Sequence, residues 1–197
     1  MDDLLTEIRA CTACQGKGRD LPLGPRAIFQ AGASARILIA GQAPGRVAHG
    51  QGRPFDDLSG DRLRDWLGID RETFYDASRI ALVPMGFCYP GTEKGADLPP
   101  RSECAPLWRA RLLAAMPHIE LTVLLGRYAL NWHLPDTRGK PLTDAVTGWR
   151  ETFPRLLPLV HPSPRNIGWL KRNPWFETET VPALRSRVAE ILGGATA

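Results

Sequence analysis

Residues 36–45 read RILIAGQAPG, and this stretch decides the fold. Its first half is a short apolar run that fits a buried strand, and Gly41 and Pro44 then end that strand. Strands of continuous apolar character are typical of a parallel sheet covered on both faces. Further apolar runs of the same kind follow along the chain at residues 80–83, 122–125 and 156–160.

Amphipathic helices are expected between these strands. Ser59–Leu67 begins with a serine that suits a helix N-cap and places Leu63, Trp66 and Leu67 on one face. Alternation of strands and helices predicts an α/β fold, and the length suits a single domain over residues 1–197. The other expected helices cover residues 2–10, 101–116, 128–133 and 181–192.

The composition is ordinary for a globular protein, with 43% hydrophobic and 23% charged residues. The longest apolar runs are too short to cross a bilayer, and the N-terminal MDDLLTEIRA has no apolar signal-peptide core. We therefore expect a cytoplasmic protein that binds no membrane. The net charge of +4 comes mainly from arginine, which permits a nucleic-acid partner but is equally explained by a GC-rich genome.

The four cysteines form two pairs. Cys11 and Cys14 make a C-x2-C motif, and Cys88 and Cys104 are separated by 15 residues. A disulfide framework is not expected in a cytosolic chain. Two thiolate pairs instead suit a tetrahedral metal centre, either zinc or an iron–sulfur cluster. The alternative is four unrelated thiols.

Polar loops follow the first and the fourth predicted strand. The first loop, residues 41–57, reads GQAPGRVAHGQGRPFDD and matches neither a Rossmann nor a P-loop pattern. The second begins at His161 with HPSPRN, so two prolines stiffen the chain around Ser163. Ligands bind beyond the carboxyl ends of parallel strands, so both loops should face one crevice. His161 is then either a site residue or a structural histidine.

These motifs, in this order, resemble those of the uracil-DNA glycosylase superfamily. Gly41–Gly45 with Gly52–Phe55 looks like motif A, and His161–Pro164 looks like motif B. The cysteines match the iron–sulfur pattern of the family 4 enzymes, and motif A also has family 5-like features. The similarity extends from Cys11 to Arg165. It implies a three-layer αβα sandwich with a four-stranded, mainly parallel sheet, and a [4Fe–4S] cluster in preference to zinc.

The resemblance implies a base-excision-repair hydrolase that flips uracil out of DNA and cleaves its N-glycosidic bond. His161 would donate a hydrogen bond to the uracil oxygen that becomes negative, and Phe55 would stack on the base. Arg165 stands where the superfamily commonly has a wedging leucine, and it could fill the gap, stack or bind a phosphate. Such an enzyme would act as a monomer on DNA, associated with the nucleoid in a bacterium. The implied substrate-binding residues are Gly41, Ala43, Phe55, Gly86 and Asn166, and the implied DNA-binding residues are Ser163, Pro164 and Arg165.

The residue that activates water departs from the superfamily pattern. Family 4 has a glutamate at the position of Gln42, and family 1 has an aspartate at the position of Ala43. Gln42 can orient a water through its amide but cannot accept its proton. Asp57, which resembles an acidic residue of family 5, becomes the candidate general base, with helix capping as its alternative role. His49 is a second substitute.

The residue that reads the base also departs from the pattern. Pro84 stands where family 4 has an asparagine that pairs with the uracil edge. Base reading would then fall to the backbone amides of Met85 and Gly86, or to Asn166 or Asn131. Three hypotheses stay open: a uracil-DNA glycosylase, a glycosylase for hypoxanthine or xanthine, and a lesion-binding protein without turnover.

Overall fold

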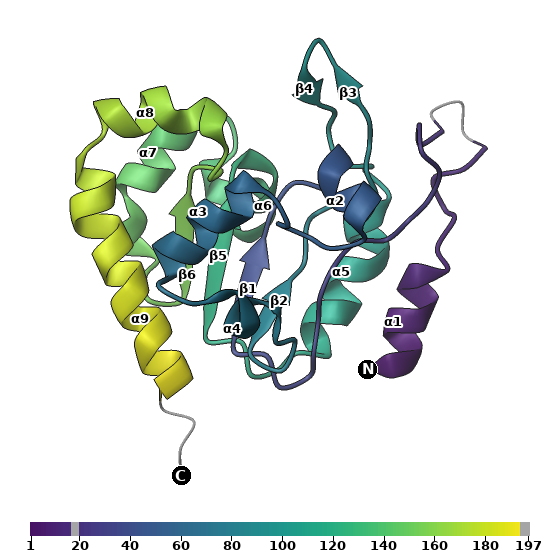
Figure 1. Cartoon of the computed structure of the whole chain (residues 1–197), viewed down its shortest axis with the longest axis horizontal. Coiled ribbons are helices and arrows are strands. Elements are labelled where there is room, and N and C mark those ends of the chain that lie inside the picture. Colours follow the sequence, from purple (N-terminus) through teal and green to yellow (C-terminus); the bar gives the residue numbers. More distant parts are fainter. Residues whose placement is uncertain (17–19, 194–197) are drawn as a thin grey trace.

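Four parallel strands form the centre of the fold (Figure 1). The computed structural model describes residues 1–16 and 20–193, so residues 17–19 and 194–197 of the predicted domain lie outside the described residues. The sheet order is β2-β1-β5-β6, and every neighbouring pair is parallel. The predicted α/β class with a four-stranded parallel sheet is thereby confirmed. The strands are β1 (Ile37–Ala40), β2 (Ile80–Leu82), β5 (Leu121–Leu125) and β6 (Leu156–Leu159).

Both faces of the sheet are covered, which explains the continuous apolar strands. Successive side chains of a strand point to opposite faces. In β1, Ile37 and Ile39 pack into one core cluster, whereas Leu38 packs into another. All four residues of β1 are buried, so no position of this strand calls for a polar side chain.

Helices form the two outer layers. Helices α3 and α9 cover the face of Ile37 and Ile39, and α1 and α5 cover the face of Leu38. No helix in the described part of the chain is long and apolar enough to span a membrane. The helices are α1 (Asp2–Arg9), α2 (Arg46–Gln51), α3 (Leu58–Leu67), α4 (Arg71–Tyr75), α5 (Cys104–Ala114), α6 (Arg127–His133), α7 (Leu142–Thr147), α8 (Ile167–Arg172) and α9 (Val181–Gly193), with 3-10 helices η1 (Pro135–Thr137), η2 (Trp149–Glu151) and η3 (Pro164–Asn166) and a π-helix η4 (Phe176–Thr180).

Two predicted helix starts need correction. Helix α3 is capped by Asp57, whose Oδ1 accepts a hydrogen bond from the N–H of Gly60 at 3.0 Å, and not by Ser59. Helix α5 begins at Cys104, later than the predicted residue 101, because a turn with a bond from Cys104 N–H to the Arg101 carbonyl precedes it. Cys104 therefore lies in the first turn of α5.

A small hairpin was not predicted. Its strands β3 (Thr92–Glu93) and β4 (Ala96–Asp97) pair antiparallel. Lys94 and Gly95 both have positive φ, 48° and 76°, as a tight two-residue hairpin turn requires. Figure 1 shows the hairpin projecting at the end of the molecule toward which the sheet strands point.

Candidate functional site

A crevice of about 620 Å³ opens at the carboxyl ends of the central strands. This volume falls within the range of small-molecule sites. Residues 41–45 and Phe55 line it from the first strand-end loop, and His161 and residues 163–166 line it from the fourth. The expectation that these two loops share a crevice is confirmed.

The loop after β1 continues the pairing of β1 with the chain after β2. The N–H of Met85 donates to the Gly41 carbonyl at 2.8 Å, and that of Gly86 donates to the Gln42 carbonyl at 2.9 Å. The Gln42 side chain donates through Nε2 to the Leu98 carbonyl at 2.9 Å. Its Oε1 has no hydrogen-bond partner among residues 1–16 and 20–193 and is available as an acceptor. Gln42 and Ala43 both line the crevice.

Phe55 is held in a strained backbone conformation, with φ at 55°. Its carbonyl accepts hydrogen bonds from the Tyr75 hydroxyl at 3.0 Å and from the Arg64 guanidinium at 3.2 Å. A Cβ at Gly60 would lie 1.8 Å from this carbonyl oxygen, so only glycine permits the approach. The backbone of Phe55 is therefore fixed before any ligand enters.

His161 faces Phe55 across the crevice, with ring centroids 6.2 Å apart and planes inclined by 25°. Its Nδ1 accepts a hydrogen bond from the backbone N–H of Ser163 at 3.2 Å. The Asn166 side chain donates to the His161 carbonyl at 2.7 Å. Burial lowers the pKa of His161, and the negative charges of Asp57 and Asp97 oppose this shift. The ring is neutral at pH 7, and its proton lies on Nε2 because Nδ1 is an acceptor.

The chain after His161 is tightly braced. Ser163 Oγ accepts a hydrogen bond from the Arg165 N–H at 3.2 Å, and Arg62 donates to the Ser163 carbonyl at 3.3 Å. The Arg165 guanidinium donates to the Gly95 carbonyl in the hairpin. In this structure Arg165 therefore joins the second loop to the hairpin. Pro164, also expected to contact DNA, is exposed at the rim of the crevice.

Two carboxylates line the crevice in the part of the chain that the structure describes. Asp57 was expected from the sequence, and one of its oxygens caps α3. Asp97, in the hairpin, was missed. Nothing in the sequence around residue 97 marks it, because its position depends on the fold of the segment between Cys88 and Cys104.

Three other candidates do not line the crevice. Gly86 lines the cysteine cavity instead, and its N–H is bonded to Gln42. His49 is a buried residue of α2 itself, and burial and the charge of Arg26 lower its pKa. Asn131 is not among the described residues that line the crevice. The expected roles of Gly86 in base binding and of His49 in water activation find no support in this arrangement.

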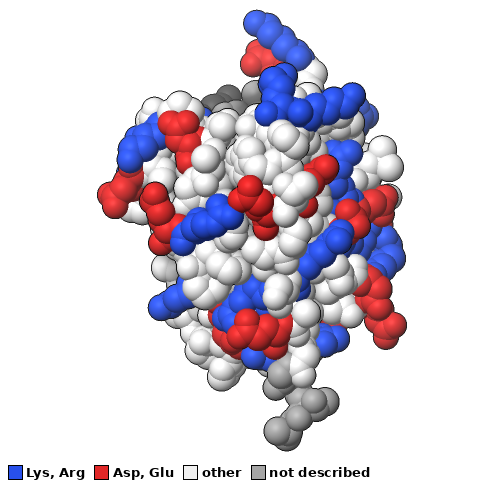
Figure 2. Space-filling model, turned by 90° about the vertical axis from the view of Figure 1, so that its left-hand side faces the viewer, with Lys and Arg blue, Asp and Glu red and all other residues white. Residues whose placement is uncertain are grey.

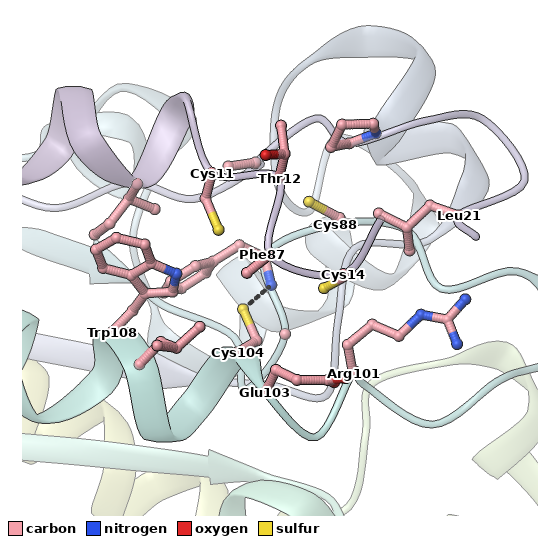
Figure 3. A pocket seen from close by; sticks show the side chains of 16 residues that line it. Cys11, Thr12, Cys14, Leu21, Phe87, Cys88, Arg101, Glu103, Cys104 and Trp108 are labelled. Carbon is pink, nitrogen blue, oxygen red and sulfur yellow. Dashed lines mark hydrogen bonds between the residues drawn. The ribbon is translucent and has the colours of Figure 1, made fainter. Parts of the chain in front are cut away.

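The four cysteines line a second cavity, shown in Figure 3. Cys11 and Cys14 follow α1, Cys88 lies on the loop after β2, and Cys104 is the first residue of α5. The sulfur atoms of all four point into the same space. Cys104 Sγ also accepts a hydrogen bond from the Phe87 N–H at 3.3 Å. Burial raises the pKa of Cys88 and raises that of Cys104 to about 12.

Within the described residues, no three His, Cys, Asp or Glu side chains are grouped so that they could hold a single metal ion. The four thiols surround the cavity without closing around one point. Two buried N–H donors in the cavity wall, Trp108 Nε1 and Arg101 Nε, have no acceptor among the described residues. A group that occupies this cavity therefore meets four thiol sulfurs, whereas the Arg101 guanidinium extends away from them.

The fold and the crevice define an α/β protein with a pre-formed ligand site at the strand ends. The sequence profile of the uracil DNA glycosylase superfamily matches residues 29–185, and the chain belongs to that superfamily. The family supports a glycosylase-type function on DNA. The chain is also similar to a protein of Methanosarcina acetivorans, solved in solution by NMR and described as a "putative Uracil DNA glycosylase". The identity is 17% and the TM-score 0.48, over 82% of this chain and 98% of that one.

Proposed function

We propose that this protein hydrolyses the N-glycosidic bond of a uracil flipped out of DNA and leaves an abasic site. One observation carries the proposal, the hydrogen bond from the Ser163 N–H to Nδ1 of His161. It leaves the Nε2–H of a neutral imidazole as the donor available to a ligand. A neutral donor at the rim of a pre-formed crevice suits a leaving group that becomes an anion.

The chemistry follows from that donor. When the bond between the uracil nitrogen and the sugar C1′ breaks, its electron pair moves onto the base, and a uracil oxygen gathers the negative charge. A hydrogen bond from His161 Nε2 to this oxygen strengthens as the charge develops. Loss of one such donor typically lowers kcat by about 10²–10³-fold.

Phe55 supplies the stacking platform for the base. Its backbone is already fixed by Tyr75, Arg64 and Gly60, so stacking orders no further chain. The Cβ position of Gly41 lies 3.7 Å from the Phe55 ring, so glycine keeps the space beside the ring open.

Gln42 and Asp57 are proposed to act on the attacking water. The Nε2 of Gln42 is anchored on Leu98, which leaves Oε1 as a fixed acceptor for a water proton. One oxygen of Asp57 caps α3, and the other is available to a water in the crevice. An Asp57→Asn variant that cleaves as fast as the parent protein would remove Asp57 from the mechanism.

The groups available to read the base are few. The N–H groups of Met85 and Gly86 are bonded to the Gly41 and Gln42 carbonyls, so they cannot read the base without breaking these bonds. Asn166 lines the crevice, and its amide nitrogen is anchored on His161, which leaves its oxygen as an acceptor for a base N–H. Hypoxanthine and xanthine also present such an N–H group. The acceptor on Asn166 and the absence of an asparagine at Pro84 favour a glycosylase for hypoxanthine or xanthine as the second candidate.

Ser163, Pro164 and Arg165 are proposed to meet the DNA at the rim of the crevice. Figure 2 shows basic side chains gathered at the upper end of one face, the end at which the hairpin projects, with mixed charges lower down. Arginine and backbone N–H groups at such a rim suit phosphate contacts.

A [4Fe–4S] cluster is proposed for the cysteine cavity. Its fit rests on the four convergent sulfurs, which are not grouped within the described residues so as to hold a single ion. The unpartnered Nε1–H of Trp108, in the wall of the cavity, would donate to the anionic sulfur of such a group. When bound, the cluster would supply structural cross-linking of segments that lie far apart in sequence.

A panel of duplexes tests the substrate. Each oligonucleotide carries one uracil, hypoxanthine, xanthine or mismatched thymine, and alkali converts abasic sites into strand breaks. Breaks at uracil that His161→Ala slows by about 10²–10³-fold support the proposal. Breaks only at hypoxanthine or xanthine support the second candidate, and a gel shift without breaks at any base contradicts both.

A further inference from the structure

The hairpin β3–β4 forms one wall of the crevice. Ala96 and Asp97 line it together with His161, and both hairpin residues are exposed. The hairpin is attached to the rest of the site on two sides, by the Arg165 guanidinium on the Gly95 carbonyl and by Gln42 Nε2 on the Leu98 carbonyl. Its position relative to the strand-end loops is therefore fixed by Gln42 of motif A and by Arg165, the residue that follows motif B.

Asp97 is held at a defined place in this wall. It pairs with Thr92 in the hairpin register, and the Thr92 hydroxyl is bonded to the Tyr89 hydroxyl. Directly after Asp97, the N–H of Leu98 donates to the Gly91 carbonyl at 2.9 Å and closes the base of the hairpin. The backbone on both sides of Asp97 is thus tied down.

The carboxylate of Asp97 differs from its acidic neighbours. It makes no hydrogen bond or ion pair within residues 1–16 and 20–193. Asp57 uses one oxygen to cap α3, and Asp56 is paired with Arg71 at 2.6 Å and Arg53 at 3.8 Å. The negative charge of Asp97 also acts on the pKa of His161, which places it within electrostatic range of the proposed donor. Both oxygens of Asp97 are free to act on a ligand.

Cleavage of a glycosidic bond needs two kinds of charge stabilisation. As the base departs with the electron pair, the sugar C1′ becomes cationic, and a nearby carboxylate stabilises it as in glycoside hydrolysis. His161, a hydrogen-bond donor, can stabilise only the negative charge on the departing base. We propose that Asp97 is a catalytic residue that faces the cationic sugar, orients the attacking water and accepts its proton as the new bond from oxygen to C1′ forms. This inference rests on the proposed glycosylase function.

Binding of abasic-site analogues tests Asp97 without turnover. One duplex carries a pyrrolidine, which is cationic at the position of the sugar, and a second carries a neutral tetrahydrofuran. The parent protein should bind the pyrrolidine duplex more tightly, by about tenfold or more, because the carboxylate attracts the cation. Asp97→Asn should reduce this ratio to about one, because it removes the charge and keeps the shape.

Glu93→Gln is the matched control, because Glu93 lies in the same hairpin, is exposed and lies outside the crevice lining. It makes the same charge change and should leave the ratio as in the parent protein. Unchanged unfolding temperatures for both variants exclude loss of the fold. In single-turnover cleavage, Asp97→Asn should be slower by about 10²–10⁴-fold and Glu93→Gln unaffected.

The two proposals fail differently. An Asp97→Asn variant that keeps the preference for pyrrolidine and cleaves at the parental rate overturns the inference and leaves the glycosylase proposal intact. Loss of the preference in Asp57→Asn and not in Asp97→Asn assigns the role to Asp57 and also overturns it. If the parent protein cleaves none of the four bases, the proposed function fails, and a parent without preference for the cation then overturns the inference as well.

Discussion

The crevice and the cysteine cavity are built in different ways, although they share one stretch of chain. Pro84 lines the crevice and Gly86 lines the cavity, two residues further on. The crevice forms at the carboxyl ends of paired strands, so the sheet brings its loops to one edge. The cavity is enclosed by the chain after α1, the chain after β2 and the start of α5, none of which is a strand of the sheet.

This difference separates what the fold supplies from what a bound group must supply. The strand-end loops hold the crevice open in the absence of any ligand, because hydrogen bonds within the protein fix the backbone of Phe55 and of His161. Burial favours the protonated thiols at Cys88 and Cys104, and protonated thiols form no covalent or metal cross-link. Deprotonation by a bound metal centre would convert them into a cross-link. Substitutions in the cavity are therefore expected to change stability, and substitutions in the crevice are expected to change the reaction.

The largest effect on stability should come from removing one thiol from the cysteine cavity. Cys104→Ser is expected to abolish cluster binding and to cost several kcal/mol of stability, since binding energy at such a centre is folding energy. Bound iron, visible absorbance and the unfolding temperature measure this. His161→Ala, as the counterpart in the crevice, should lose activity at an unchanged unfolding temperature. Equal stability and equal activity of Cys104→Ser and the parent protein would show that the cavity holds no structural group.

A second experiment tests how rigid the crevice is. Gly60→Ala places a Cβ 1.8 Å from the Phe55 carbonyl oxygen, so the backbone of Phe55 must move. We expect a destabilisation of about 1–3 kcal/mol, typical of overpacking, and weaker substrate binding. Urea unfolding and the KM for the cleaved duplex measure the two effects.

Gly50→Ala provides the control for this substitution. A Cβ at Gly50 in α2 meets no atom within 4 Å among the described residues, so the change should stabilise the helix by about 0.5–1 kcal/mol. The same chemical change thus has opposite signs at two helical positions. If Gly60→Ala were also stabilising, the fixed platform under Phe55 would be disproved.

The same contrast explains what could be predicted from the sequence. The four strands and the meeting of the loops at residues 41 and 161 followed from apolar runs and from the geometry of parallel sheets. These features depend on local pattern and on one general rule of topology. The cap of α3 is also local, but Asp57 and Ser59 both suit the position, and only the chain path selects Asp57.

The missed features depend on contacts between distant segments. The hairpin has only two residues in each strand, too few for an apolar alternation, and Asp97 reaches the crevice only because Gln42 and Arg165 hold the hairpin there. Gly86 was expected near the base, but the pairing of its N–H with Gln42 turns it toward the cysteines. No spacing in the sequence encodes these long-range bonds.

The smallest effect on stability at neutral pH is expected from a substitution of His133, at the contact between α5 and α6 near Pro84. The buried Arg109 donates to the Val83 carbonyl at 3.0 Å and lies 2.7 Å from Nε2 of His133. Burial, assisted by the charge of Arg109, lowers the pKa of His133 from 6.5 to about 3. Nε2 of the neutral His133 is thus the acceptor for the guanidinium, and protonation would break this bond.

This pairing makes stability depend on pH in a defined direction. Below pH 6.5 the unfolded chain takes up a proton at His133, whereas the folded chain does not until about pH 3. Acid therefore favours unfolding, and the stabilisation present above pH 6.5 is lost progressively down to about pH 3. His133→Gln keeps an acceptor for Arg109 and removes the titration, so its stability should fall less steeply over this window. Urea unfolding at a series of pH values measures the slope, with the exposed His118→Gln as control. Identical slopes for His133→Gln and the parent protein would mean that the folded protein tolerates a protonated His133 beside the positive charge of Arg109.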